Sequence, residues 1–85
     1  MSGVKTRFEI RLPELGEGIL QATLVVWHCR VGDYVQKDDD IVEFVTDKAV
    51  FQVSAGTSGT IQEICYREGD EVPVGAVVAI MEVPS

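Results

Sequence analysis

The chain is poor in basic residues, with 7 lysines and arginines against 14 aspartates and glutamates and a net charge of −7. This deficit argues against nucleic acid, whose phosphates attract basic surfaces, and against an anionic membrane surface. No apolar stretch approaches the roughly 20 residues that a membrane span needs. Met1–Phe8 is polar and lacks the apolar region of a secretory signal. We therefore expect a soluble domain that resists self-association and is monomeric in isolation.

Cysteine and histidine are also scarce. Cys29 and Cys65 are too few for a disulfide framework and match no metal motif. We expect two buried free thiols in a reducing compartment, with a bridge between them as the alternative. The single histidine, His28, has no neighbouring Cys or Ser constellation, so a structural or exposed role is expected. The acidic run Asp38–Asp40 lacks the alternate spacing of a calcium-binding loop and is interpreted as a solvated turn.

What the sequence does contain is a set of short apolar runs separated by turn residues. The 85 residues make one small domain, and 46% of them are apolar, enough for a core. No segment sustains a helical period, whereas runs rich in Val, Ile and Phe predict strands. The predicted strands are Phe8–Leu12, Ala22–Cys29, Asp40–Thr46, Ala49–Val53, Gly59–Tyr66 and Val77–Val83, with short pieces near Val35 and Val72.

An internal repeat relates the two halves of the chain. Trp27–Val45 aligns with Ile64–Glu82, so that the two Gly-Asp-x-Val segments coincide, at 32–35 and 69–72. The glycine supplies a positive φ and the aspartate bonds its own backbone, which makes both segments turns. The repeat predicts an all-β fold, a flattened barrel or sandwich of two small antiparallel sheets related by a pseudo-twofold axis.

The segment Asp47-Lys48-Ala49 lies between two predicted strands and reads as the tip of a β-hairpin. A lysine held there in water is poorly placed for acid–base work and well placed to be modified by another protein. In the following strand, alternation puts Phe51 and Val53 on the core face. Trp27 is expected to be a packing residue.

At this point the chain resembles the lipoyl domains of 2-oxo acid dehydrogenase acyltransferases, the E2 components. The resemblance covers about residues 8–83, so residues 1–85 are expected to form a single lipoyl domain without a linker, subunit-binding or catalytic domain. The segments that carry it are Leu12–Gly18, Val26–His28, Gly32–Val35, Thr46–Ala49, Gly59–Ile61 and Glu68–Gly75. Val45 stands where family members often have an acidic residue. Glycine-cleavage carrier proteins are also similar, but they are longer and lack a segment like Leu12–Gly18.

The resemblance implies lipoic acid attached to Lys48, flanked by Asp47 and Ala49, by a lipoate-attaching enzyme. It implies that a thiamine-diphosphate decarboxylase (E1) acylates the lipoyl group and that the E2 catalytic core passes the acyl group to coenzyme A. A flavoenzyme (E3, dihydrolipoamide dehydrogenase) would then reoxidise the dithiol. The domain would be no enzyme by itself, but the substrate carrier of an acyltransferase. The expected compartment is the bacterial cytoplasm, or the mitochondrial matrix in a eukaryote.

Two alternatives remain open at this stage. One is a non-catalytic β-sandwich interaction module with an unmodified lysine. The other is a biotinyl carrier domain, although such domains place Met on both sides of the lysine, where Asp47 and Ala49 stand here. The sequence does not choose among pyruvate, 2-oxoglutarate and branched-chain 2-oxo acids.

Recognition of the correct E1 requires exposed residues near the lysine. If the first strand leads back alongside the hairpin, a surface loop over Gly16–Thr23 would lie close to Lys48. Its exposed charge could meet a basic patch on E1. The predicted contacts are Glu17, Ile19, Leu20 and Gln21.

Overall fold

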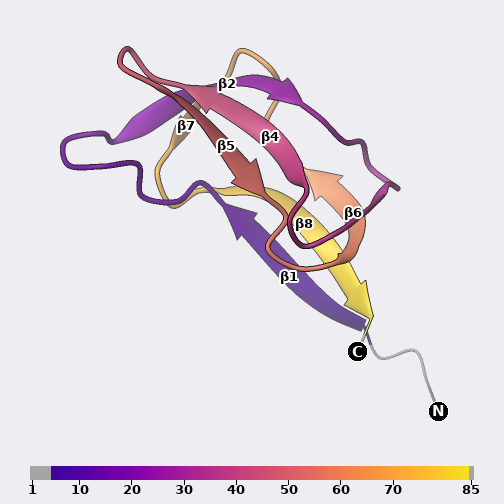
Figure 1. Cartoon of the computed structure of the whole chain (residues 1–85). Coiled ribbons are helices and arrows are strands. Elements are labelled where there is room, and N and C mark those ends of the chain that lie inside the picture. Colours follow the sequence, from indigo (N-terminus) through magenta and orange to yellow (C-terminus); the bar gives the residue numbers. More distant parts are fainter. Residues whose placement is uncertain (1–4, 85) are drawn as a thin grey trace.

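The computed structural model describes residues 5–84, which form eight strands and, within that range, no helix (Figure 1). The strands coincide with short apolar runs, because β-branched residues favour extended structure. The turns between them carry Gly, Pro or Asp, which favour turn conformations. The strands are β1 (Lys5–Arg11), β2 (Gln21–Trp27), β3 (Tyr34–Val35), β4 (Asp40–Val45), β5 (Val50–Ser54), β6 (Gly59–Ile64), β7 (Glu71–Pro73) and β8 (Val77–Pro84). Over the same residues there is accordingly no helical segment that could cross a membrane.

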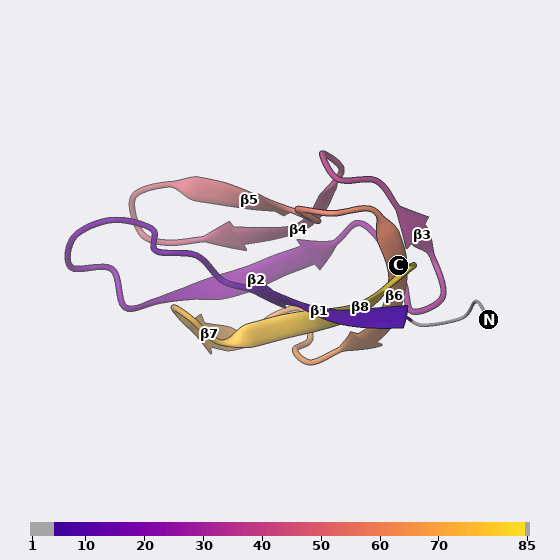
Figure 2. The same ribbon diagram turned by 90° about the horizontal axis from the view of Figure 1, so that it is seen from below.

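The strands form two antiparallel four-stranded sheets that pack face to face (Figure 2). One sheet has the order β1-β8-β6-β3 and the other β5-β4-β2-β7. Each sheet therefore takes two strands from each half of the chain. Exchanging β1 with β5, β2 with β6, β3 with β7 and β4 with β8 converts one order into the other. This confirms the predicted two-sheet fold with its pseudo-twofold axis, and it adds that the halves interlock.

The repeat holds at the level of single hydrogen bonds within the two Gly-Asp turns. The carboxylate of Asp33 accepts a hydrogen bond from the backbone N–H of Arg30 at 2.9 Å. In the second half, Asp70 accepts one from Arg67 at 2.8 Å. The local backbone bonding expected of these aspartates is thus present in both turns.

The same turns are tied to the neighbouring long strands. Gly32 donates its N–H to the carbonyl of Ile61 in β6, and Gly69 donates to Leu24 in β2, both at 2.7 Å. Both glycines have a positive φ, +98° and +95°. An L-residue with a side chain rarely adopts this conformation, so glycine is required at both positions.

The core fills the space between the two sheets. Its largest fully buried side chains are Phe44, Leu12, Leu24, Ile41, Ile61, Met81, Val42, Val72 and Val78. Val53 is buried as expected, whereas Phe51 is only half-buried because β5 is an edge strand. Trp27 has the expected packing role: it is half-buried against the core and its indole Nε1 donates to the carbonyl of Tyr66 at 2.9 Å.

Several boundaries differ from the sequence-based expectation. The first strand begins at Lys5 because it pairs with β8 as far as Pro84. Ala49 belongs to the turn and not to β5. The expectation of two core cysteines is wrong for Cys65, which lies beyond the end of β6 and is exposed. Cys29 is buried, and both thiols are free.

The β4–β5 turn lies at the opposite end of the molecule from the start of β1 and the end of β8 (Figure 1). β1 and β8 pair from Lys5 opposite Pro84, which places both described ends together. The fold thus places the turn that carries Lys48 far from the paired residues Lys5 and Pro84.

Candidate functional site

Lys48 lies at the tip of the hairpin that β4 and β5 form. Val45 and Val50 are the last paired residues of the two strands, and beyond them Thr46 donates its N–H to the carbonyl of Ala49 at 2.9 Å. Only Asp47 and Lys48 lie between the two residues that this hydrogen bond joins. The hairpin tip predicted from the sequence is therefore confirmed, with Lys48 as the second residue of a two-residue loop.

The side chain of Thr46 shapes this loop. Its Oγ1 accepts hydrogen bonds from the backbone N–H groups of Lys48 at 3.3 Å and Ala49 at 3.2 Å. Two-residue hairpin loops usually need a positive φ, which Asn or Gly supplies. No non-glycine residue of the described chain has one. The Thr46 hydroxyl instead satisfies the N–H groups that such a turn leaves unpaired.

The Lys48 side chain is exposed to solvent. Within residues 5–84 no carboxylate forms an ion pair with it, and the two neighbours Asp47 and Ala49 are exposed as well. The amine is therefore open to a modifying enzyme from several directions. The described residues of the turn leave the lysine side chain in water.

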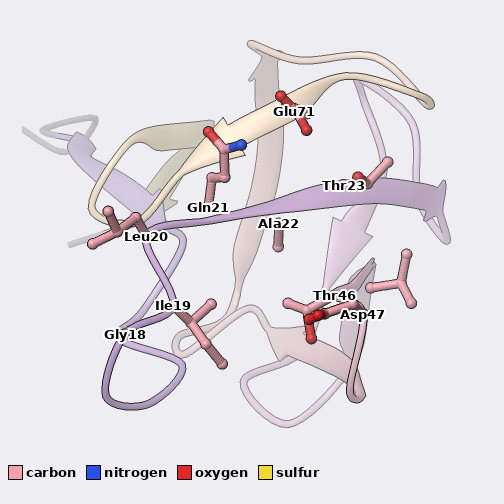
Figure 3. A pocket seen from close by; sticks show the side chains of 10 residues that line it. Gly18, Ile19, Leu20, Gln21, Ala22, Thr23, Thr46, Asp47 and Glu71 are labelled. Atoms are coloured by element: carbon pink, nitrogen blue, oxygen red, sulfur yellow. The ribbon is translucent and has the colours of Figure 1, made fainter.

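A groove of about 620 Å³ adjoins the turn. Its wall on the lysine side is formed by Val45, Thr46 and Asp47, and the facing wall comes from the end of the loop between β1 and β2, the β1–β2 loop (residues 12–20). Figure 3 shows Ile19 and Leu20 on the loop side, across from Thr46 and Asp47. The remaining lining residues are Gly18, Gln21, Ala22, Thr23 and Glu71.

The predicted recognition residues lie where the sequence placed them, with one correction. Ile19, Leu20 and Gln21 line the groove, and Glu17 is exposed on the same loop without lining it. The predicted loop over Gly16–Thr23 is too long, because Gln21 is already the first residue of β2 and pairs with Pro73. That non-local pairing could not be seen in the local sequence.

The other candidates do not gather into a site. His28 lies just beyond β2 with an exposed side chain, and its Nε2 is 3.9 Å from Glu43 Oε1. In the Asp38–Asp40 turn, Asp39 accepts a hydrogen bond from the backbone N–H of Gln36 at 2.9 Å. No group of three or more His, Cys, Asp or Glu side chains suited to a metal occurs in the part of the chain that the structure describes.

Neither thiol is activated. Burial raises the pKa of Cys29, and the nearby carboxylate of Asp33 raises it further. Partial burial also raises the pKa of Cys65, with Glu63 as the next contributor. A raised pKa lowers the fraction of the reactive thiolate at neutral pH. The raised pKa of each thiol therefore disfavours the thiolate form that a nucleophile needs.

Comparison with known proteins agrees with this geometry. The biotin/lipoyl family model, described as "Biotin-requiring enzyme", matches residues 8–81. The solution structure of the lipoyl domain of the 2-oxoglutarate dehydrogenase complex from Azotobacter vinelandii is 37% identical, with a TM-score of 0.71 over 86% of this chain and 92% of that one. The chain is a lipoyl domain of the biotin/lipoyl family.

Larger proteins contain regions similar to this lipoyl domain. The dihydrolipoyllysine-residue acetyltransferase components of the pyruvate dehydrogenase complexes of Staphylococcus aureus and Staphylococcus epidermidis are 38% identical over 77 residues. The match covers 91% of this chain and 18% of each relative, so the domain spans less than a fifth of their length. Urea carboxylase of Kluyveromyces lactis shares the fold, with a TM-score of 0.76 at 22% identity over 89% of this chain and 6% of that protein.

Proposed function

We propose that Lys48 carries a lipoyl group, joined by an amide bond between the carboxyl carbon of lipoate and Nζ of the lysine. The observation that carries this proposal is the exposed amine at the tip of a two-residue hairpin loop, in a domain 37% identical to a lipoyl domain. Asp47 and Ala49 flank it without covering it. A lipoate-attaching enzyme would form the bond and would supply the activated carboxyl group.

An exposed lysine suits a covalently attached group that extends into solvent, as lipoate does, better than a cofactor enclosed by the protein. The bound lipoyl group would supply a dithiolane that accepts and releases an acyl group as a thioester. The chain's own residues would hold the attachment point in water, through the Thr46 hydrogen bonds, and would supply recognition. Asp47 and Ala49 stand where biotinyl domains have Met, so the lipoyl proposal is preferred to the biotinyl one.

We propose further that the domain belongs to the E2 acyltransferase of a 2-oxo acid dehydrogenase complex. Its partners would then be E1, the E2 catalytic core and E3, in the bacterial cytoplasm or the mitochondrial matrix. The relatives belong to pyruvate and 2-oxoglutarate complexes. The proposed substrate is therefore an acyl group derived from a 2-oxo acid. A tether raises the concentration of the arm at each active site, as this role needs.

Recognition by E1 is assigned to the surface around the groove. Lipoate is common to all such carriers, so selection of the correct domain requires the protein surface near Lys48. Glu17 is an exposed charged residue on the β1–β2 loop. Leu20 is apolar, and 80% of its surface is exposed to solvent. We propose that Glu17 meets a basic patch on E1, with Ile19, Leu20 and Gln21 as the adjoining contacts.

The function is tested by offering the domain, after co-expression with a lipoate-attaching enzyme, to purified E1 enzymes with thiamine diphosphate and an isotopically labelled 2-oxo acid. The wild type should acquire label from one E1 class, and the Lys48→Arg variant should acquire none. Arginine keeps the charge and removes the acylatable amine. A lipoylated wild-type domain that no E1 of the three classes acylates would refute the carrier role.

A further inference from the structure

The groove beside Lys48 has a counterpart at the other end of the molecule. The counterpart is a hollow of about 150 Å³. Its lining residues are Tyr34, Thr60, Glu82 and Pro84. The same repeat that relates Gly32 to Gly69 relates these positions to four residues of the groove, namely Glu71, Thr23, Val45 and Asp47. The strand framework therefore produces one hollow at each end, and the two can be compared directly.

The groove beside the lysine is the larger of the two, about 620 Å³ against 150 Å³. The cause is a difference in the connections. The β1–β2 loop has nine residues (12–20), whereas the equivalent β5–β6 connection has four (55–58). Gly18, Ile19 and Leu20 of the longer loop line the groove. Among the described residues, the longer loop thus enlarges the groove at the end that carries Lys48 beyond the hollow that the repeated strands form at the other end.

The longer loop is held in place, so the groove is formed in advance. The carbonyl of Leu20 accepts a hydrogen bond from the N–H of Val74 at 2.9 Å, and Leu15 packs against the core. Gly16 and Gly18 have φ values of +135° and +82°, which allow the bends that return the loop toward the turn. A preformed wall costs less ordering entropy when something binds against it.

The lining of the groove combines apolar and polar groups in about equal measure. Apolar side chains in the lining come from Ile19, Leu20, Ala22 and Val45. Polar side chains come from Gln21, Thr23, Thr46, Asp47 and Glu71. Ligand sites commonly combine apolar walls with a few polar groups in this way. At the counterpart hollow, Glu82 stands in the place of Val45, and none of the described residues that line it comes from the β5–β6 connection.

We propose that the groove seats the apolar end of the lipoyl group carried by Lys48. This inference rests on the proposed lipoylation of Lys48. The tether holds the dithiolane at an effective concentration in the millimolar range, so even weak affinity for the groove fills it a large part of the time. A dithiolane bound in the groove lies beside Leu20 and Gln21. E1 would then contact the lipoyl group and the recognition residues at the same time.

The test compares the unmodified and lipoylated domains by NMR, without E1. Lipoylation should shift the amide signals of Ile19, Gln21, Thr23 and Glu71, and leave those of Tyr34 and Thr60 unchanged. Nuclear Overhauser contacts should join the lipoyl methylenes to the methyl groups of Ile19 and Leu20. Leu20→Ser should weaken the contacts to Ile19, whereas Val31→Ser, at an exposed valine outside the groove, should leave them intact. Added salt should have little effect, because the contact is apolar.

The two claims fail in different ways. Intact mass reports whether Lys48 is modified before any spectrum is recorded. A domain that takes up no lipoate in cells with an active attaching enzyme would overturn both the lipoylation and the seat. A fully lipoylated domain whose shifts change only at residues 47–49, with no contact to Ile19 or Leu20, would overturn the seat and leave the attachment standing.

Discussion

Thr46 is the residue that fixes how Lys48 is presented. Its hydroxyl accepts two backbone N–H groups of the turn, those of Lys48 and Ala49. This arrangement lets the hairpin close over Asp47 and Lys48 without a glycine. The sequence predicted which lysine stands at the tip. It did not reveal the part played by Thr46, because a threonine before a turn has many uses and only the backbone geometry distinguishes them.

Replacing Thr46 by valine tests this role. The change keeps the shape of the side chain and removes the acceptor, so we expect a loss of about 1 kcal/mol in the free energy of unfolding. Lipoylation of Lys48 should also be slower, since the turn is less well defined. Thr6→Val, at an exposed position in β1, is the matched control. Chemical denaturation and the rate of mass gain with the attaching enzyme measure the two effects, and equal values for both variants would argue against the role.

The two cysteines should differ in accessibility. Cys65 is exposed and should be alkylated by iodoacetamide in the native domain, whereas Cys29 is buried and should react only on unfolding. Both pKa values are raised, so both reactions should be slow at neutral pH and accelerate above the usual thiol range. Peptide mass spectrometry at several pH values measures this. Fast labelling of native Cys29 at neutral pH would contradict the assigned burial.

At the scale of elements, the repeated Gly-Asp turns organise the two sheets. Each turn is closed by its own aspartate and tied by its glycine to a long central strand. The turns and their aspartate bonds followed from the sequence, because the repeat carries turn residues in register with apolar runs. The hydrogen bonds from the two glycines to β6 and β2 did not, since they join segments far apart in the chain. The start of β2 and the length of the loop before it did not follow, since they depend on the pairing of Gln21 with Pro73 in a distant segment.

The equivalence of the two turns can be measured. Asp33→Ala and Asp70→Ala each remove one carboxylate acceptor of a backbone N–H, and each should cost about 1 kcal/mol of stability. The two hydrogen bonds share no partner, so the double variant should show the sum of the single costs. Asp38→Asn, in a turn without such a counterpart, is the control. A large effect at one position and none at the other would show that the halves are not energetically equivalent.

At the scale of the whole molecule, the fold places the turn that carries Lys48 at the opposite end from Lys5 and Pro84. The described ends, Lys5 and Pro84, pair with each other at one end of the molecule, and the β4–β5 turn lies at the other (Figure 1). The whole chain carries a net charge of −7, which favours association with basic surfaces on other proteins. The fold class, the position of the lysine and the nearness of the loop were all predictable. The size of the groove was not, because it arises from two segments that meet only in the folded chain.

The proposed contacts to E1 on the β1–β2 loop and at the start of β2 can be tested by substitution. Combining Glu17→Gln with serine at Ile19 and Leu20 and alanine at Gln21 should leave thermal stability and lipoylation nearly unchanged. Reductive acylation by the cognate E1 should be slower, mainly at low salt, where charge steers association. Asp38→Asn combined with Val31→Ser provides a control of similar chemistry elsewhere on the surface. Equal acylation rates for fully lipoylated wild type and loop variant would exclude the loop as the specificity element.

The central claim is that the turn presents Lys48 as the sole lipoylation site. Intact mass with peptide mapping, after co-expression with a lipoate-attaching enzyme, measures this directly. We expect one lipoyl group on Lys48 in the wild type and in Asp47→Ala, and none in Lys48→Arg. Exchanging Asp47 with Lys48 should sharply reduce modification, because the lysine then occupies the first position of the loop. A lipoyl group on Lys5 or Lys37, or native-rate modification of the exchanged variant, would contradict the account.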